Sequence, residues 1–384
     1  MSYIYLDNIT ATKPHREVVD IITEYLTDKY ALAISQFSHS MGIESKDGYD
    51  NARHIIANSI GAKDENIVFT SGSTESNNLA IKGFARANKK KGNHLITTAV
   101  ADRSVMNSMK TLQREGFEIT ILPVDTNGRI DLNKLADTIK DSTTLFSFEL
   151  ANHEVGTIEN YEEIIRLCKE KNIAVHMDAS LGYLHIPIDM KTLPVDLVTL
   201  TAKRIHGPIG VGALYIRDGI KIEKIMDGGF NEMNLRAGSE PVALAVGFAK
   251  AVELFDRDKD VIYTGKLKEK LLQLLKEKIA EISVNGDPDK AMNNVLNVTF
   301  HKVEGESTAL YFDMEKIEVI TGSACFSQSL EPSYVLMAMY NDHERAHGSI
   351  TFSFSRYNTE DEIVKTADTA KQIVDKLMEI SPLK

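Results

Sequence analysis

Asn66-Ile67-Val68-Phe69-Thr70-Ser71-Gly72-Ser73-Thr74-Glu75 is the stretch that indicates which kind of fold this chain adopts. The apolar run Asn66–Thr70 is short and ends in polar residues, which predicts a buried strand. The amphipathic segment Glu75–Asn88 follows and predicts a helix. Ser73 and Thr74 would then stand at a helix N-terminus, where hydroxyls and backbone amides can bind a phosphate. Both residue types are also ordinary N-caps, and the stretch matches neither Walker A nor G-x-G-x-x-G, so it does not predict a nucleotide site.

The same alternation of apolar runs and helical segments continues on both sides, over about residues 50–250. Six further runs are predicted strands: His94–Thr98, Glu118–Pro123, Thr144–Leu150, Ala174–Asp178, Leu197–Thr201 and Gly212–Ile216. Predicted helices between them are Val105–Glu115, Leu132–Lys140 and Tyr161–Lys171. Apolar strands that alternate with helices favour a mainly parallel sheet buried on both sides. The sequence therefore predicts an α/β fold with a seven-stranded sheet and helices on both faces.

The pattern changes in the last third of the chain. Gly247–Lys278 predicts a long helical stretch rich in Leu, Lys and Glu. Shorter predicted strands, Asn294–Phe300 and Ser349–Ser355, and a predicted helix, Glu360–Ile380, follow it. This mixture predicts a smaller α+β domain.

Length and composition limit the function classes. The chain has 384 residues, 43% of them hydrophobic and 26% charged, which excludes disorder, collagen-like repeats and a coiled coil. A formal net charge of -11 argues against a general nucleic-acid or membrane-surface binder, and no apolar run is long enough to span a membrane. The two cysteines, Cys168 and Cys325, form no disulfide framework, so a cytoplasmic location is expected. Cys168 lies on the apolar stripe of a predicted helix and is expected to be a core thiol.

Polar residues follow several predicted strands, where parallel sheets bind their ligands. Asn152-His153-Glu154, Asp178 and Thr201-Ala202-Lys203-Arg204 stand at such strand ends. They place acids and a basic pair beside the Ser73–Thr74 loop. No metal site is expected, because His343 and His347 have helical spacing but no further ligand near them in the sequence.

Motifs along nearly the whole chain carry a family resemblance. In order they are Tyr5-Leu6-Asp7-Asn8, Phe69–Asn78, Asn152-His153-Glu154-Val155-Gly156-Thr157, His176-Met177-Asp178-Ala179, His206-Gly207-Pro208, Gly210–Tyr215, Leu235-Arg236-Ala237-Gly238-Ser239-Glu240, Gly322-Ser323-Ala324-Cys325, Ser329–Ser333 and Arg356–Glu360. Together they resemble the cysteine desulfurases of the NifS/IscS group, which are fold-type I pyridoxal phosphate (PLP) enzymes of the class-V aminotransferase kind. The resemblance implies a PLP-transferase-like large domain over residues 15–250 and a small α+β domain formed by residues 1–14 and 251–384.

The resemblance also implies roles for individual residues. Asp178 would hold the pyridine nitrogen of PLP in its protonated form, so that the ring acts as an electron sink. The cofactor-binding set near the phosphate would be Ser73, Thr74, Thr201 and Ser239, with Ser239 serving the pocket of the other subunit of a homodimer. Cys325 matches the thiolate that takes sulfur from the substrate and carries it as a persulfide.

Several positions that contact the cofactor or the substrate depart from the family pattern. The departures are Arg204 for the Schiff-base lysine, Lys203 for the preceding His, Asp102 for the His that stacks on the ring, Leu181 for the Gln at the ring oxygen, His153 for an Asn, and Thr351 for the Arg that binds the substrate carboxylate. An arginine stays protonated and cannot form the aldimine. The resemblance thus implies PLP as cofactor, while Arg204 argues against its covalent attachment and leaves open that none binds.

Three functional hypotheses follow from these departures. The first is a desulfurase-like protein impaired in PLP catalysis, which serves sulfur transfer or iron–sulfur cluster assembly with a scaffold protein or sulfur acceptor. Cys325 would be its persulfide-carrying or cluster-ligating thiol. The alternatives are an active cysteine desulfurase that uses Lys203, and a non-catalytic module that binds an anion or PLP. A buried guanidinium needs a partner, so Arg204 is further predicted to form an ion pair with Asp178, Asp102 or both.

Overall fold

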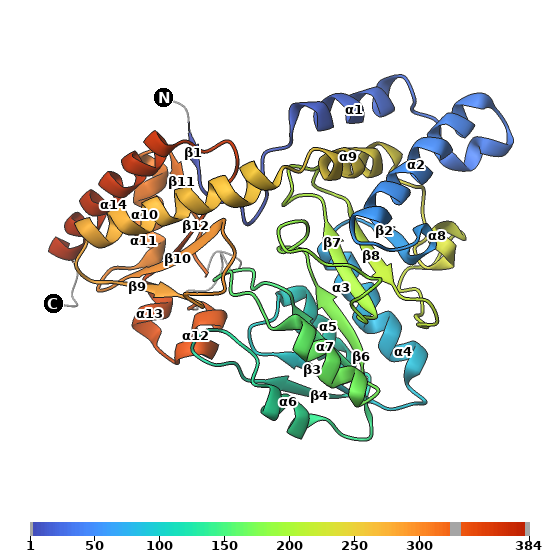
Figure 1. The fold of residues 1–384 in the computed structure, drawn as a ribbon, viewed down its shortest axis with the longest axis horizontal. Coiled ribbons are helices and arrows are strands. Elements are labelled where there is room, and N and C mark those ends of the chain that lie inside the picture. Colours follow the sequence, from blue (N-terminus) through green and yellow to red (C-terminus); the bar gives the residue numbers. More distant parts are fainter. Residues whose placement is uncertain (1–2, 323–331, 381–384) are drawn as a thin grey trace.

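The computed structural model describes residues 3–322 and 332–380, and its larger sheet has seven strands (Figure 1). Their order is β2-β8-β7-β6-β5-β3-β4. Their bounds are β2 Ile67–Thr70, β3 His94–Thr98, β4 Glu118–Leu122, β5 Thr143–Glu149, β6 Ala174–Asp178, β7 Leu197–Thr201 and β8 Gly212–Ile216. β8 runs antiparallel to both of its neighbours, and the other pairs are parallel. The predicted α/β fold with a mainly parallel seven-stranded sheet is confirmed.

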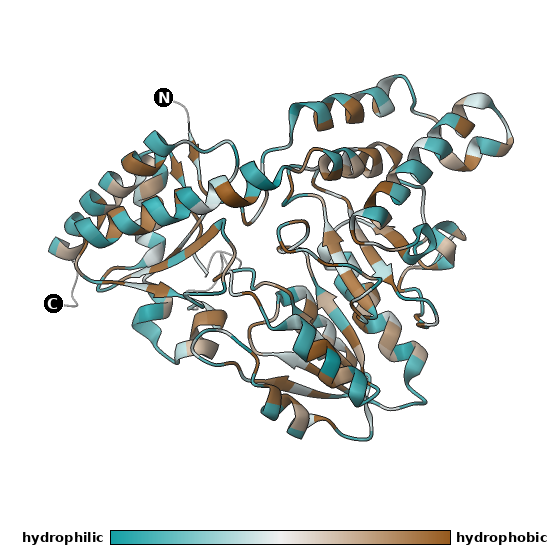
Figure 2. Cartoon of the chain, viewed as in Figure 1, coloured by the Kyte–Doolittle hydropathy of each residue, from teal (hydrophilic) through white to brown (hydrophobic). Residues whose placement is uncertain are grey.

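Both faces of this sheet are buried, because consecutive strand residues enter different hydrophobic clusters. Phe69 packs on one side and its neighbour Val68 on the other, and the same holds for Ile96 and Leu95. Figure 2 shows the hydrophobic residues concentrated in these strands. The helices around the sheet are α1 Arg16–Thr27, α2 Ser40–Ser59, α3 Ser73–Asn78, α4 Phe84–Asn88, α5 Arg103–Arg114, α6 Leu132–Thr138, α7 Tyr161–Glu170, α8 Asn231–Asn234 and α9 Val242–Glu253, with short helical turns η1 Ala33–Phe37, η2 Asp64–Asn66 and η3 Leu79–Gly83.

A second, smaller group of strands uses both ends of the chain. The strands β9 Ile282–Asn285, β10 Val295–Phe300 and β12 Ser349–Ser353 form an antiparallel sheet in the order β12-β10-β9, and β1 Ile4–Tyr5 pairs in parallel with β11 Ile317–Glu318. The helices are α10 Thr264–Lys278, α11 Gly305–Met314, α12 Tyr334–Tyr340, α13 His343–His347 and α14 Glu360–Ile380. Leu6 and Phe352 share one buried core. The division at residues 14 and 250 stays a prediction.

The predicted helical stretch Gly247–Lys278 is helical over most of its length but is interrupted after Glu253. The helix α9 ends at Glu253, and a π-helical turn, η4 Asp258–Tyr263, leads into α10. The Asp256 side chain accepts hydrogen bonds from the backbone amides of Asp258 and Lys259, so it caps the next helical segment and competes with continuation of α9.

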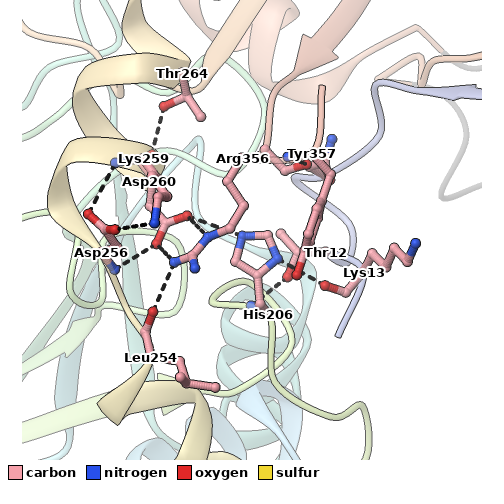
Figure 3. A network of polar contacts seen from close by, with 12 residues as sticks. Thr12, Lys13, His206, Leu254, Asp256, Lys259, Asp260, Thr264, Arg356 and Tyr357 are labelled. Atoms are coloured by element: carbon pink, nitrogen blue, oxygen red, sulfur yellow. Dashed lines mark hydrogen bonds and ion pairs between the residues drawn. The ribbon is translucent and has the colours of Figure 1, made fainter. Parts of the chain in front are cut away.

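A buried polar network ties the C-terminal strands to the large sheet (Figure 3). The carboxylate of Asp260, 2% exposed, contacts the guanidinium of Arg356, whose Nε lies 2.6 Å away, and His206 Nε2 at 3.3 Å. His206 Nδ1 in turn donates to the carbonyl of Lys13 at 2.9 Å. The network therefore connects the N-terminal segment, the turn after β7, η4 and the segment after β12.

Two other expectations from the sequence concern Cys168 and membrane-spanning helices. Cys168 in α7 is fully buried, and burial raises the pKa of its thiol to about 12, which confirms a core thiol. Within residues 3–322 and 332–380, no helix is long and apolar enough to cross a membrane.

Candidate functional site

The candidate site lies at the carboxyl ends of the parallel strands, as expected for an α/β sheet. Asp178 is the last residue of β6, and Glu149, the last residue of β5, stands opposite it in register. Asp102 caps α5 after β3, and Arg204 lies in the turn after β7. The strand order thus brings together residues that are up to about a hundred positions apart.

Asp178 is held by two hydrogen bonds and is 3% exposed. Its Oδ2 accepts from Asn77 Nδ2 at 2.7 Å and its Oδ1 from the backbone amide of Ser180 at 2.9 Å. Burial, reinforced by the charge of Asp102, raises the pKa of Asp178. The carboxyl group is therefore rigidly oriented at the rim.

A chain of hydrogen bonds runs from Asp178 to Asp102. Asn77 Nδ2 also donates to Ser104 Oγ at 2.8 Å, and Ser104 Oγ donates to Asp102 Oδ1 at 2.5 Å. The Ser104 amide donates to the same oxygen at 2.7 Å, which makes Asp102 the N-cap of α5. Burial opposes ionisation of Asp102, but the charge of His153 and the Ser104 hydrogen bonds outweigh it and lower the pKa of Asp102.

The predicted ion pair between Arg204 and Asp178 or Asp102 is wrong. Arg204 Nε donates to the carbonyl of Ile9 at 2.7 Å, and Nη1 donates to Ser180 Oγ at 3.0 Å. Ser180 thus stands between the guanidinium and Asp178, to which its amide is bonded. The N-terminal segment thus supplies a carbonyl acceptor, and no carboxylate of residues 3–322 or 332–380 forms an ion pair with the guanidinium.

Lys203 precedes Arg204 in the turn after β7, and its backbone carbonyl is hydrogen-bonded to Thr12. Its carbonyl accepts from the amide of Thr12 at 2.8 Å and from Thr12 Oγ1 at 3.0 Å. Burial raises the pKa of Asp7, and the charges of Lys203 and Arg204 act in the opposite direction. The ammonium of Lys203 is therefore close enough to Asp7 to act on its carboxyl group.

The residues expected near a phosphate lie in two places. Ser73 and Thr74 open α3, and Thr201, 1% exposed, ends β7, a strand that α3 contacts. Ser239 is exposed in the segment before α9. Arg236 Nε in that segment contacts Glu75 Oε1 at 3.0 Å, which ties the segment to the start of α3.

The structure describes one of the two positions that are expected to contact the substrate, Thr351, but not the other, Cys325. Thr351 is buried in β12 opposite Asn297, whose Nδ2 donates to Thr351 Oγ1 at 2.7 Å. This side chain is engaged in a cross-strand hydrogen bond and carries no charge. Cys325 lies outside the described residues.

Sequence reasoning missed Glu149 and Tyr334. Glu149 Oε1 lies 2.9 Å from His153 Nδ1, and Tyr334 Oη lies 3.1 Å from His153 Nε2. Burial acts to lower the pKa of His153, but the charges of Glu149 and Asp102 outweigh it and raise the pKa to about 9. The i, i+4 spacing of Glu149 and His153 at a strand end was the available signal. Tyr334 gave none, because it is distant in sequence.

Comparison with known proteins identifies the family of this chain. The class-V aminotransferase family matches residues 4–365. The chain belongs to this family. A cysteine desulfurase IscS from Dictyoglomus turgidum is 42% identical over 99% of this chain and 97% of its own length, and one from Methanosarcina thermophila is 41% identical over 99% and 94%. A solved NifS-like protein aligns with a TM-score of 0.90 at 31% identity, covering 98% of this chain and all of that one.

These likenesses place the chain in the NifS/IscS group of cysteine desulfurases, with a fold-type I architecture. PLP is the cofactor of this family, and Asp178 suits its ring nitrogen. Schiff-base attachment does not suit the neighbouring residues, because Arg204 offers a guanidinium bonded to Ile9 and Ser180. Asp102 also presents a carboxylate where the cysteine desulfurases of this group stack an imidazole. The guanidinium of Arg204 therefore does not fit a Schiff base with PLP.

Proposed function

We propose that this chain is a cysteine desulfurase-like protein that serves sulfur transfer in iron–sulfur cluster assembly and is impaired in PLP catalysis. The observation that supports the proposal is that Arg204, which matches the family's Schiff-base lysine in sequence, is hydrogen-bonded to Ile9 and Ser180. The neutral Thr351, where the family has a carboxylate-binding Arg, supports it. The division into a large domain, 15–250, and a small domain, 1–14 with 251–384, belongs to the same proposal.

Cys325 would be the working thiol. Its thiolate would attack the outer sulfur of a persulfide on a donor protein or small thiol. The donor's S–S bond breaks, a new S–S bond forms on Cys325, and the donor leaves as a thiol, so the exchange needs no further oxidant or reductant. The resulting persulfide would pass to a sulfur acceptor, or the thiol would ligate a cluster on a scaffold protein.

We further propose that the chain acts as a homodimer in the cytoplasm. Large apolar side chains are exposed around α1, η1 and α8: Leu26, Tyr30, Ile34, Phe37 and Phe230, with Phe37 at 87% and Phe230 at 86%. Apolar groups so exposed are typical of an interaction surface. In a dimer, Ser239 would serve the partner's pocket. Sedimentation equilibrium tests this, and a monomer at all concentrations would contradict it.

Two other functions compete with this proposal. An active desulfurase would have to form its aldimine on Lys203, whose turn is bound to Thr12. A non-catalytic module would bind PLP or another phosphate through Thr74, Thr201, Lys203 and Ser239 without a covalent bond.

The test combines spectroscopy with mass spectrometry. The visible spectrum is recorded with added PLP, sulfide release from L-cysteine is assayed, and borohydride-treated protein is searched for a pyridoxyl-lysine. Incubation with a small-molecule persulfide is followed by peptide mass analysis. We expect no aldimine band, no sulfide and a persulfide on Cys325, with the buried Cys168 as the internal unmodified control.

Each competing function has its own signature. An aldimine band that disappears in Lys203→Ala, together with sulfide release, would establish the active enzyme and overturn the proposal. Saturable binding of PLP without a covalent adduct, with Cys325 unmodified, would favour the binding module.

A further inference from the structure

Three side chains that are common metal ligands converge at the rim of the sheet. One ligand atom each from Asp102, Glu149 and His153 lies within 4.8 Å of the other two. They come from the start of α5, the end of β5 and the turn after β5, so the sheet topology positions all three. They form one group in space, which we call the Asp–Glu–His cluster.

Hydrogen bonds outside the cluster determine which nitrogen of His153 faces it. Tyr334 Oη donates to the carbonyl of Ala101 at 2.9 Å, because that oxygen can only accept. The tyrosine hydroxyl has no second proton, so it accepts from His153 Nε2–H at 3.1 Å. His153 Nδ1 is then the atom directed at Glu149 Oε1, 2.9 Å away. In the absence of a metal ion, a proton on Nδ1 completes an ion pair with Glu149, and a metal ion would take the place of that proton between the same two atoms.

The two carboxylates are likewise held by one oxygen each. Glu149 Oε2 accepts from Asn152 Nδ2 at 3.1 Å, and Asp102 Oδ1 accepts from the amide and hydroxyl of Ser104. Asp102 Oδ2 accepts no hydrogen bond from any residue in 3–322 or 332–380. Each carboxylate therefore keeps one oxygen for a cation, and its other oxygen fixes its orientation.

We propose that Asp102 Oδ2, Glu149 Oε1 and His153 Nδ1 bind a first-row divalent metal ion such as Mn²⁺, Fe²⁺ or Zn²⁺. One imidazole nitrogen with two carboxylate oxygens suits these ions better than Mg²⁺ or Ca²⁺, which take oxygen ligands. Ligands at about 2.1 Å from an ion stand about 3 Å apart at a right angle, which is the separation of Glu149 and His153.

The surroundings suit a cation with an open coordination position. The side chain of His153 is 18% exposed and that of Glu149 is 8% exposed, so an ion can enter from solvent and keep water ligands. Asp102 stands where cysteine desulfurases of this group stack a His on the cofactor ring. The ion would therefore lie at the ring-stacking place of the family, and the proposal does not depend on sulfur handling by Cys325.

The test measures metal binding directly. Metal-free protein is titrated with Co²⁺ and followed by visible absorption, and equilibrium dialysis against Mn²⁺ or Zn²⁺ is followed by elemental analysis. We expect one ion per chain in the wild type. The near-isosteric variants Asp102→Asn and Glu149→Gln, and His153→Gln, should each weaken binding by roughly a hundredfold or more, because each removes a direct ligand.

Matched controls separate this site from other ligands. His343→Gln removes an exposed histidine on α13 and should leave binding unchanged. Cys325→Ser should also leave it unchanged, which distinguishes this site from a thiol-ligated cluster. Tyr334→Phe keeps all three ligands but removes the acceptor for Nε2–H, so it should weaken binding by about 10–100-fold. Thermal melts check that each variant is folded.

Two results would overturn the proposal. One is the absence of stoichiometric binding by the wild-type chain for Co²⁺, Mn²⁺ and Zn²⁺. The other is binding that folded Asp102→Asn and Glu149→Gln proteins retain at full strength, because the ion would then be held elsewhere.

Discussion

Glu159 and Arg204 are both buried or half-buried ionisable groups, and they are accommodated in different ways. Arg204 donates hydrogen bonds to the carbonyl of Ile9 and to the hydroxyl of Ser180. Glu159, 8% exposed, accepts long hydrogen bonds of 3.2 and 3.4 Å from the amide of Ile130. Those bonds do not offset desolvation, and burial raises the pKa of Glu159 to about 8. Ionisation of Glu159 therefore opposes folding.

Glu159→Gln is expected to change the pH dependence of stability. The folded-state pKa of Glu159 lies above its unfolded value, so its contribution is fully present below about pH 4.5 and is lost as pH rises through about 8. The glutamine cannot ionise, so the variant should resemble wild type at pH 5 and exceed it by a few kcal/mol at pH 9. Urea unfolding midpoints measure this, with the exposed Glu162→Gln as control. Parallel pH curves for wild type and Glu159→Gln would contradict it.

At the scale of elements, close backbone approach positions the start of α3. Gly212 begins β8 opposite Thr70 and Thr201. A Cβ on Gly212 would lie 2.8 Å from the Cα of Gly72 and from the carbonyl oxygen of Leu200. Both contacts are to backbone, which cannot move away as a flexible side chain can. The turn that introduces Ser73 and Thr74 therefore requires glycine at this point of β8.

Gly212→Ala should lower the free energy of unfolding by about 1–3 kcal/mol, as overpacking does elsewhere. The matched control is Gly265→Ala in α10, where the added Cβ would lie 3.5 Å from the Asn293 side chain. The control should gain up to about 0.5–1 kcal/mol, because alanine favours a helix over glycine. Chemical denaturation of both variants measures the difference, and equal stability would refute the backbone contact.

Local sequence patterns predicted which segments form helices and strands, but they did not always predict where those elements end. The strand β6 has the bounds that its apolar run predicts, and so does α14. The break between α9 and α10 was missed because the Leu-, Lys- and Glu-rich pattern was read across the acidic segment Asp256–Asp260, which interrupts it. A single capping carboxylate, Asp256, decides that break. Thr351 was identified as a departure, whereas its bond to Asn297 depends on strand register.

At the scale of the whole molecule, the Asp260 network joins segments from both chain ends to the large sheet (Figure 3). Arg356 contacts Asp260 and also donates to the carbonyl of Leu254 at 3.1 Å. Burial opposes ionisation of Asp260, but its hydrogen bonds to His206 and Arg356 outweigh it and lower its pKa. Removal of one partner from such a buried pair leaves a charge without compensation.

Arg356→Gln should therefore cost about 3–5 kcal/mol at neutral pH. The lowered pKa of Asp260 means that its stabilisation is present above about pH 4 and is lost as pH falls below that. The variant should lose less of its remaining stability on acidification than wild type does. Calorimetry between pH 3 and 7 measures this. The control is Lys270→Gln, which breaks the more exposed ion pair between Lys270 and Glu360. It should lower the free energy of unfolding by at most about 1 kcal/mol. An equal loss for both variants would contradict the role of the Asp260 network.

The sequence by itself determined the sheet, the family and the positions at which the cofactor site departs from it. Apolar runs and helical periodicity are local properties, and motif spacing is a property of the chain. Tertiary structure alone decided the partners of Arg204 and the meeting of Asp102, Glu149 and His153. Those contacts join segments on different strands, and their distances follow from strand order and register, which no local pattern specifies.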